Sequence, residues 1–280
     1  MKRTLAIFLA AAIAVTAVSC GKAAKETASE EENITVSETT SLDLDALLSE
    51  YTTTAEELEQ QLAEMKETAM ERVDLTAKPI PEYTIPDDWK EMSDGRMKFL
   101  VPPDVEDQTS STGSLILGKY RNEDKSVSVI IMKGNDWSEH EEDEEDNYFP
   151  EASEENYTKA FSELGLDYDG TRTSFYKAVL SFTSADRTEE NAEAFDNAAL
   201  AKGLCFLTFP EVYYVCSDGH DIYAHGYPSE GLNGEKYPES NDARFWVGAF
   251  ADSNTEYTLM VQGSSKEEAL MICSTIEIIG

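Results

Sequence analysis

The chain has 280 residues, enough for one sizeable domain with accessory segments or for two small domains. Hydrophobic residues make up 41% of it and aromatic residues 10%, which excludes disorder throughout the chain. With 22 Lys and Arg against 56 Asp and Glu, the net charge is -34. A surface this acidic repels nucleic-acid phosphates and anionic lipid headgroups, so we expect no nucleic-acid partner and no electrostatic binding to a membrane.

The first 19 residues predict an export signal. A basic start is followed by an apolar run from Leu5 to Val18, shorter than the roughly 20 residues that a membrane-spanning helix needs. The run closes in Ala17-Val18-Ser19-Cys20, which resembles the lipobox of bacterial lipoprotein precursors, although Ala17 stands where that family usually has Leu. The resemblance implies cleavage before Cys20 and acylation of its sulfur, palmitate included. Cys20 would then anchor the chain on the extracytoplasmic face of the cell membrane. The alternative is an ordinary secretory signal.

Three further segments precede the predicted domain. Residues 20–40 are polar and are expected to form a disordered tether that carries the lipid. Residues 41–78 are predicted as an amphipathic helical segment, with a helix start near Thr54, where Glu57 completes a capping box. A helix packed on its own domain, or a stalk, is favoured over a dimeric coiled coil. Three prolines make residues 79–86 an extended linker.

Residues 87–280 are predicted to form one α+β domain, an antiparallel sheet of about seven to eight strands with packed helices. The turn signals Asp94-Gly95 and Asp218-Gly219 each predict a hairpin. In the first hairpin, Trp89 is expected opposite Leu100. The other expected strands are 115–120, 127–132, 204–209, 212–216, 221–227, 245–251, 256–262 and 275–279. The expected helices are 153–164, 189–200 and 265–273, while 176–182 suits a strand or a helix equally.

This order of elements resembles the PsbP/Mog1-like folds. The resemblance rests on Met97-Lys98-Phe99-Leu100-Val101-Pro102-Pro103 after an early hairpin, and on Cys273-Ser274-Thr275-Ile276 at the end of a late helix. It implies an adaptor or assembly module, and it carries over no catalytic residues.

Three cysteines follow the lipidation site. If Pro210-Glu211 forms the turn between two strands, Cys205 and Cys216 lie opposite each other and could form a disulfide in an exported protein. The alternative is a pair of buried free thiols. Cys273, on the terminal helix, is expected in the core.

No catalytic residue and no cofactor are predicted. His220 follows Cys216 by four residues and precedes Asp221, but neighbours in a hairpin do not by themselves align a nucleophile with a base. The sequence has no Gly-x-Ser-x-Gly, phosphate-loop or His-Glu-x-x-His motif.

No metal site is predicted either. The acidic run 139–146 and the fragment Asp167-Tyr168-Asp169-Gly170 offer oxygen ligands to calcium without the spacing of a calcium loop. A solvated acidic surface is therefore the favoured interpretation of the run.

The sequence also concentrates aromatic residues around His225. Because alternate residues of a strand point to opposite faces, half of the group should enter the core and half could line a groove. Ordinary sheet packing is the favoured interpretation. The group consists of Tyr213, Tyr214, Tyr223, Tyr227, Phe245 and Trp246.

Together these features predict an exported, membrane-anchored lipoprotein that serves as a non-catalytic binding or scaffolding module, with an envelope protein as a partner. Two alternatives stay open: an envelope hydrolase without a local sequence signature, and a solute-binding lipoprotein.

Overall fold

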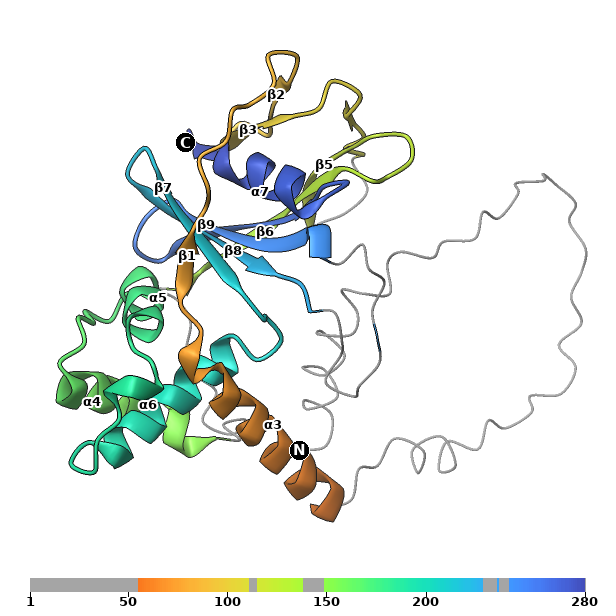
Figure 1. The fold of residues 1–280 in the computed structure, drawn as a ribbon. Helices are drawn as coiled ribbons and strands as arrows, with labels where there is room; N and C mark the ends of the chain where they lie inside the picture. Colours follow the sequence, from red (N-terminus) through yellow and green to blue (C-terminus); the bar gives the residue numbers. More distant parts are fainter. Residues whose placement is uncertain (1–54, 111–114, 138–148, 229–235, 237–241, 280) are drawn as a thin grey trace, which may run out of the picture. The chain divides into compact units, whose positions relative to one another are not determined.

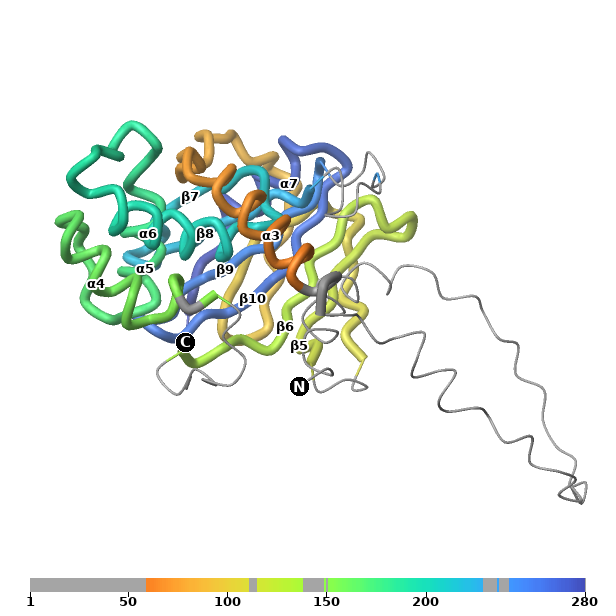
Figure 2. The backbone as a smooth tube through the Cα atoms, turned by 90° about the horizontal axis from the view of Figure 1, so that it is seen from below, coloured from red at the N-terminus to blue at the C-terminus, as the bar shows by residue number. Residues whose placement is uncertain are grey.

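The computed structural model describes residues 55–110, 115–137, 149–228, 236 and 242–279. The chain divides into two compact units, residues 1–63 and 64–280. The second unit has the predicted α+β architecture. In Figure 1, helices α4, α5 and α6 cover one face of a large sheet, and α7 with a small sheet covers the other. Figure 2 shows the same three helices from below, in front of strands β7 to β9.

The large sheet has eight strands, which agrees with the predicted seven to eight. Its strands pair antiparallel except at one edge, where β1 runs parallel to β7. In spatial order the strands are β1 (Ala77–Pro79), β7 (Val212–Ser217), β8 (His220–Gly226), β9 (Arg244–Phe250), β10 (Thr255–Gln262), β6 (Ser128–Asp136), β5 (Ile116–Arg121) and β4 (Glu106–Asp107).

The small sheet contains the first predicted hairpin. Its strands are β11 (Glu277–Ile278), β3 (Met97–Val101) and β2 (Lys90–Ser93). Glu91, not Trp89, stands opposite Leu100, so the predicted register is wrong by two residues. Four residues, Asp94 to Met97, lie between the paired Ser93 and Lys98 instead of two, and the Asp94 carboxylate accepts hydrogen bonds from the backbone N–H groups of Arg96 and Met97 within this wider turn.

Local signals explain where the helices start and end. The Thr171 side chain accepts a hydrogen bond from Ser174 N–H at the start of α5, and Ser265 does the same for Glu268 at the start of α7. Helix α4 ends at Gly165, whose φ of 68° is left-handed. The helices are α3 (Ala55–Glu71), α4 (Glu154–Leu164), α5 (Arg172–Ser181), α6 (Ala192–Cys205) and α7 (Lys266–Ser274).

The structure extends the sheet into the segment predicted as a linker. Strand β1 pairs with β7, and the N–H of Ile80 donates to the carbonyl of Tyr214 at 2.9 Å. Residues 77–80 therefore belong to the sheet. The last turns of α3 also pack on this unit, since Ala69 is fully buried and a Cβ added at Gly203 of α6 would lie 2.0 Å from the Ala69 carbonyl oxygen.

Two cores lie on opposite faces of the large sheet. The first core is apolar and fills the space between the large sheet, α7 and the small sheet. Cys273 belongs to it, as predicted. Its members include Met97, Phe99, Tyr120, Ile131, Ile222, Phe245, Val247, Leu259 and Ile272.

The second core lies between the large sheet and helices α4 to α6, and it is rich in aromatic rings. Its members include Phe161, Phe175, Tyr176, Phe182, Phe195, Phe206, Tyr223 and Phe250. Beside it, the fully buried Lys202 of α6 donates from Nζ to the carbonyls of Val73 at 2.7 Å and Phe182 at 2.6 Å. Burial lowers the pKa of Lys202 to about 8.

Candidate functional site

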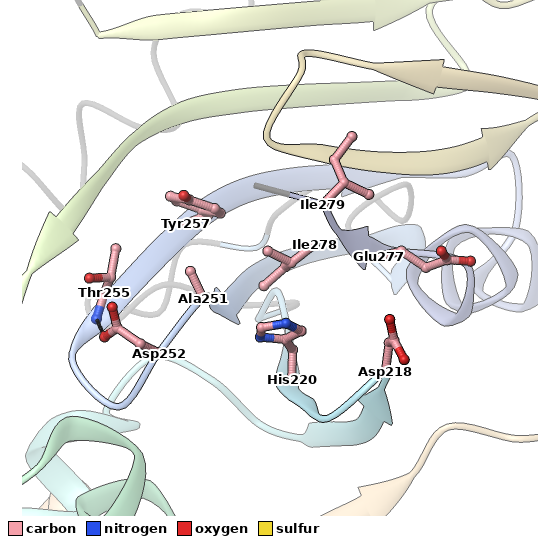
Figure 3. Close-up of a pocket in the computed structure, with 9 residues that line it drawn as sticks. All are labelled: Asp218, His220, Ala251, Asp252, Thr255, Tyr257, Glu277, Ile278 and Ile279. Atoms are coloured by element: carbon pink, nitrogen blue, oxygen red, sulfur yellow. Dashed lines mark hydrogen bonds between the residues drawn. The ribbon is translucent and has the colours of Figure 1, made fainter.

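A cleft of about 730 Å³ opens beside β11, where the ends of β8, β9 and β10 meet. Figure 3 shows the side chains that line it, which come from the β7–β8 and β9–β10 turns, from the adjoining residues of β8 and β10, and from the end of the small sheet. They are Asp218, His220, Ala251, Asp252, Thr255, Tyr257, Glu277, Ile278 and Ile279.

Two tight turns position the polar side chains of the cleft. The β7–β8 turn has positive φ at Asp218 (50°) and Gly219 (86°), as a two-residue hairpin turn requires. In the β9–β10 turn, the Asp252 carboxylate accepts hydrogen bonds from the N–H groups of Asn254 at 2.8 Å and Thr255 at 2.7 Å. These bonds lower the pKa of Asp252, which stays ionised. Both turns thereby present a carboxylate at the same edge of the sheet.

His220 lies at the centre of the group in Figure 3. Its Nδ1 is 3.1 Å from the carbonyl oxygen of Phe250. A carbonyl can only accept, so Nδ1 carries a proton and donates it to this oxygen. The ring is thus oriented by the sheet.

The cleft is acidic with an apolar border. The Glu277 carboxylate binds Lys98 Nζ at 2.7 Å, and this hydrogen bond raises the pKa of Lys98. Asp218 and Asp252 form none of the ion pairs seen among the described residues. Ile279, half exposed, borders the opening. The arrangement suits a surface that carries basic and apolar side chains.

The structure separates Cys216 from His220. Cys216 lies on the face of β7 that also carries Tyr214, which packs against the second core. His220 lies on the face of β8 that also carries Ile222, a member of the first core. The two side chains are on opposite faces of the hairpin and form no nucleophile–base pair.

The predicted Cys205–Cys216 disulfide required residues 204–209 to form a strand beside β7, and this strand prediction is wrong. Residues 204–209 form no strand; Cys205 ends helix α6, and Asp221 stands opposite Cys216. Both cysteines are free thiols in the structure. The apolar run predicted a strand here, but the fully buried Phe206 continues the packing of α6 against the second core.

The predicted aromatic group divides between the two faces of the sheet, as strand alternation requires. Tyr213 and Phe245 contact each other on the first-core side, with ring centroids 5.9 Å apart. Tyr214 and Tyr223 do so on the second-core side, at 5.1 Å. The other two members, Tyr227 and Trp246, are partly exposed and belong to neither core cluster.

Of the two acidic segments considered as calcium ligands, the structure describes only one. The acidic run 139–146 lies outside the described residues. Asp169 closes the turn before α5, where hydrogen bonds with Ser174 and Thr171 lower its pKa to about 2. In the described ranges no group of His, Cys, Asp and Glu side chains could hold a metal ion, and no helix is long and apolar enough to cross a bilayer.

Sequence reasoning missed most of the cleft. The spacing in the sequence pairs His220 with Cys216, and Asp218-Gly219 indicates only a turn. Asp252, Tyr257 and Glu277 carry no local motif, because the cleft forms between segments that are distant in the sequence.

Comparison with known proteins identifies no family. No family model matches the chain, and no curated protein matches it. Among solved structures, it is similar to the solution structure of cyanobacterial PsbP (CyanoP) from Synechocystis sp. PCC 6803. The identity is 10%, the TM-score is 0.32, and the match covers 71% of this chain and 97% of that chain. At this level the similarity supports no argument about function.

Proposed function

We propose that this chain is an exported lipoprotein, anchored through Cys20, whose α+β unit is a non-catalytic binding or scaffolding module at the cell envelope. The observation that supports the anchor is the apolar leader that ends in Ser19-Cys20 and is followed by a polar segment. Two or more acyl chains hold a protein stably on a membrane, so a diacylated and further acylated Cys20 would suffice as the anchor.

The cleft supports binding in preference to catalysis. The groups that could act on a substrate are already engaged in holding the structure: Asp252 closes a turn, Glu277 pairs with Lys98, and His220 is bonded to a backbone carbonyl. No described thiol lines the cleft.

The partner proposed for the cleft is an envelope protein with a basic and apolar surface. Asp218 and Asp252 provide negative charge at the opening, and Ile279 provides exposed apolar area beside them. Charge complementarity of this kind orients a partner and accelerates its association, whereas the apolar contact contributes to affinity.

The anchor is tested by Cys20→Ser. We expect this variant to lose labelling by a palmitate analogue and to move from the membrane pellet to the soluble fraction. The matched control is Cys216→Ser, which removes an exposed cysteine of β7 and should change neither result. Retention of unlabelled Cys20→Ser protein in the membrane pellet would refute the anchor.

The binding role is tested by a photo-crosslinking amino acid at position 279 in intact cells. We expect a discrete cross-linked envelope protein, and we expect its yield to fall in Asp218→Asn, which removes the charge and tolerates the left-handed turn. The same cross-linker at the exposed Glu163 of α4 is the control. Equal cross-linking from both positions, insensitive to Asp218→Asn, would contradict the proposal.

A further inference from the structure

Three aromatic rings enclose the guanidinium group of Arg172 on the second-core side of the sheet. Its Cζ atom lies 4.1 Å from the ring centroid of Trp137, 4.9 Å from that of Tyr176 and 5.2 Å from that of Phe175. A cation within about 6 Å of a ring centroid is attracted by the negative face of the ring. Rings grouped in this way around a cation form an aromatic cage.

A buried carboxylate completes the cage. Glu256 is 5% exposed, and its Oε2 accepts a hydrogen bond from the indole N–H of Trp137 at 2.9 Å. Among the described residues no basic side chain forms an ion pair with it. An ionised carboxylate in such a place is costly unless a cation lies nearby, and Arg172 is the cation that opposes the rise of its pKa on burial.

Glycines on the two strands that flank Glu256 leave room for its side chain and backbone. A Cβ added at Gly248 of β9 would lie 2.3 Å from Glu256 Oε1, so any larger residue at this position would displace the carboxylate from its present place. On the other flanking strand, a Cβ added at Gly134 of β6 would lie 2.1 Å from the Glu256 backbone oxygen. The β10–β6 register is also irregular between Glu256 and Thr258. Two glycines and a bulge thus surround one acidic residue, and bulges commonly redirect a side chain at a site.

The Arg172 guanidinium occupies the cage, but not all of its N–H donors have a hydrogen-bond partner. Its Nε is buried and has no hydrogen-bond partner. The backbone N–H of Arg172 donates to Asn254 Oδ1 at 2.9 Å, and its side chain interacts with Tyr176 and Cys205, where it opposes the rise of both pKa values on burial. The loop before it contains Gly165 and Gly170, both at positive φ, which allow sharp changes of chain direction. The side chain therefore enters the cage from the first turn of α5.

We propose that Trp137, Phe175, Tyr176 and Glu256 form a binding site for a guanidinium group, which Arg172 of the same chain occupies as an autoinhibitory contact. An external ligand with a guanidinium group competes with Arg172 for the site. The planar guanidinium stacks on aromatic faces and is less strongly hydrated than an ammonium ion, so the site selects it over an amine. This site is separate from the cleft, and the proposal does not depend on the function proposed above.

The test is chemical rescue of Arg172→Ala, which vacates the cage. The thermal midpoint of unfolding is measured against millimolar N-ethylguanidinium chloride, with ethylammonium chloride at the same concentration for comparison. We expect N-ethylguanidinium to raise the midpoint of the variant by a few degrees and to saturate, because a ligand that binds only the folded state stabilises it. Ethylammonium should raise it less, and the wild-type midpoint should not rise at the same concentrations.

Two variants control the test. Arg172→Ala/Glu256→Gln keeps the shape of the cage but removes its charge, and the rescue should disappear. Arg187→Ala removes an exposed arginine that pairs with Asp196 outside any cage, and N-ethylguanidinium should not stabilise it. If Arg172→Ala is unfolded alone, recovery of its near-ultraviolet circular dichroism by N-ethylguanidinium is the readout. Failure to recover, equal rescue by ethylammonium, or equal stabilisation of Arg187→Ala would overturn the proposal.

Discussion

The two cores of this protein bury different kinds of side chain. The first core, under α7, consists of apolar residues. The second core, under α4 to α6, borders three buried side chains that carry or can gain a charge: Lys202, His225 and Glu256. Hydrocarbon burial is insensitive to pH, whereas buried ionisable groups stabilise the fold only in one protonation state. The comparison therefore divides the molecule into a part that responds to packing alone and a part that also responds to pH.

The largest expected effect tests whether both cores are equally well packed. Phe245→Ala in the first core and Phe206→Ala in the second should each lower the free energy of unfolding by about 3–5 kcal/mol, because each ring is fully buried. Denaturant unfolding at neutral pH measures both losses. A loss below about 1 kcal/mol for Phe206→Ala alone would show that the second core is loosely packed.

The next effect is the pH dependence of the free energy of unfolding, which should come from the second core and not from the first. Burial lowers the pKa of His225 to about 4, although its bond to the carbonyl of Trp246 opposes this shift. The unfolded chain, with a histidine pKa near 6.5, binds the proton first, so this contribution to stability is complete above pH 6.5 and falls toward pH 4. The gap between these values corresponds to about 3 kcal/mol at 1.36 kcal/mol per pH unit.

His225→Phe should therefore flatten the loss of stability between pH 6.5 and pH 4, measured as the free energy of unfolding at several pH values. Val247→Ala, in the first core, should lower stability equally at each pH and keep the wild-type slope. If His225→Phe and the wild-type protein lose stability in parallel, burial of His225 does not govern the acid response.

Two glycine substitutions should lower the free energy of unfolding by smaller amounts, one through a steric clash and the other through an unfavourable backbone conformation. Gly203→Ala places a Cβ 2.0 Å from the Ala69 carbonyl oxygen, so α3 and α6 must shift, and we expect a loss of about 1–3 kcal/mol. Gly95→Ala, in the hairpin on the first-core side, meets no atom within 4 Å but requires a φ of 90°, and should cost about 1 kcal/mol. Thermal unfolding compares the two variants, and a larger loss for Gly95→Ala would contradict the close helix contact.

The smallest effect concerns charge outside both cores. Arg187 and Asp196 form an ion pair at 2.9 Å, with each side chain about half exposed. Asp196→Asn should lower the free energy of unfolding by less than either glycine substitution does, and the loss should vanish at high salt. A loss that is larger, or independent of salt, would show that this surface pair is as important as the buried charges.

Local turn chemistry made much of the fold predictable from the sequence. Asp94-Gly95 and Asp218-Gly219 predicted hairpins that form, and Ser265 predicted the start of α7. The failures have a common cause. The apolar run 204–209 was predicted as a strand, but Leu204 and Cys205 are the last residues of helix α6, and the wrong element placed Cys205 opposite Cys216.

The cleft and the cage were beyond prediction for a related reason. Trp137, Arg172 and Glu256 are far apart in the sequence, and they meet only because α5 starts against the β9–β10 turn. Strand β1 was missed in the same way, since three residues ending in Pro79 carry no strand signal and pair only through a distant partner.

The β9–β10 turn takes part in both sites. Asp252 and Thr255 line the cleft, while Ser253 accepts a hydrogen bond from Thr173 N–H at 3.1 Å and Asn254 holds Arg172. If occupation of one site moved this turn, these contacts would carry the movement to the other site. Thermodynamic linkage then requires reciprocity: whatever factor a partner in the cleft imposes on guanidinium affinity, guanidinium must impose on the affinity for that partner.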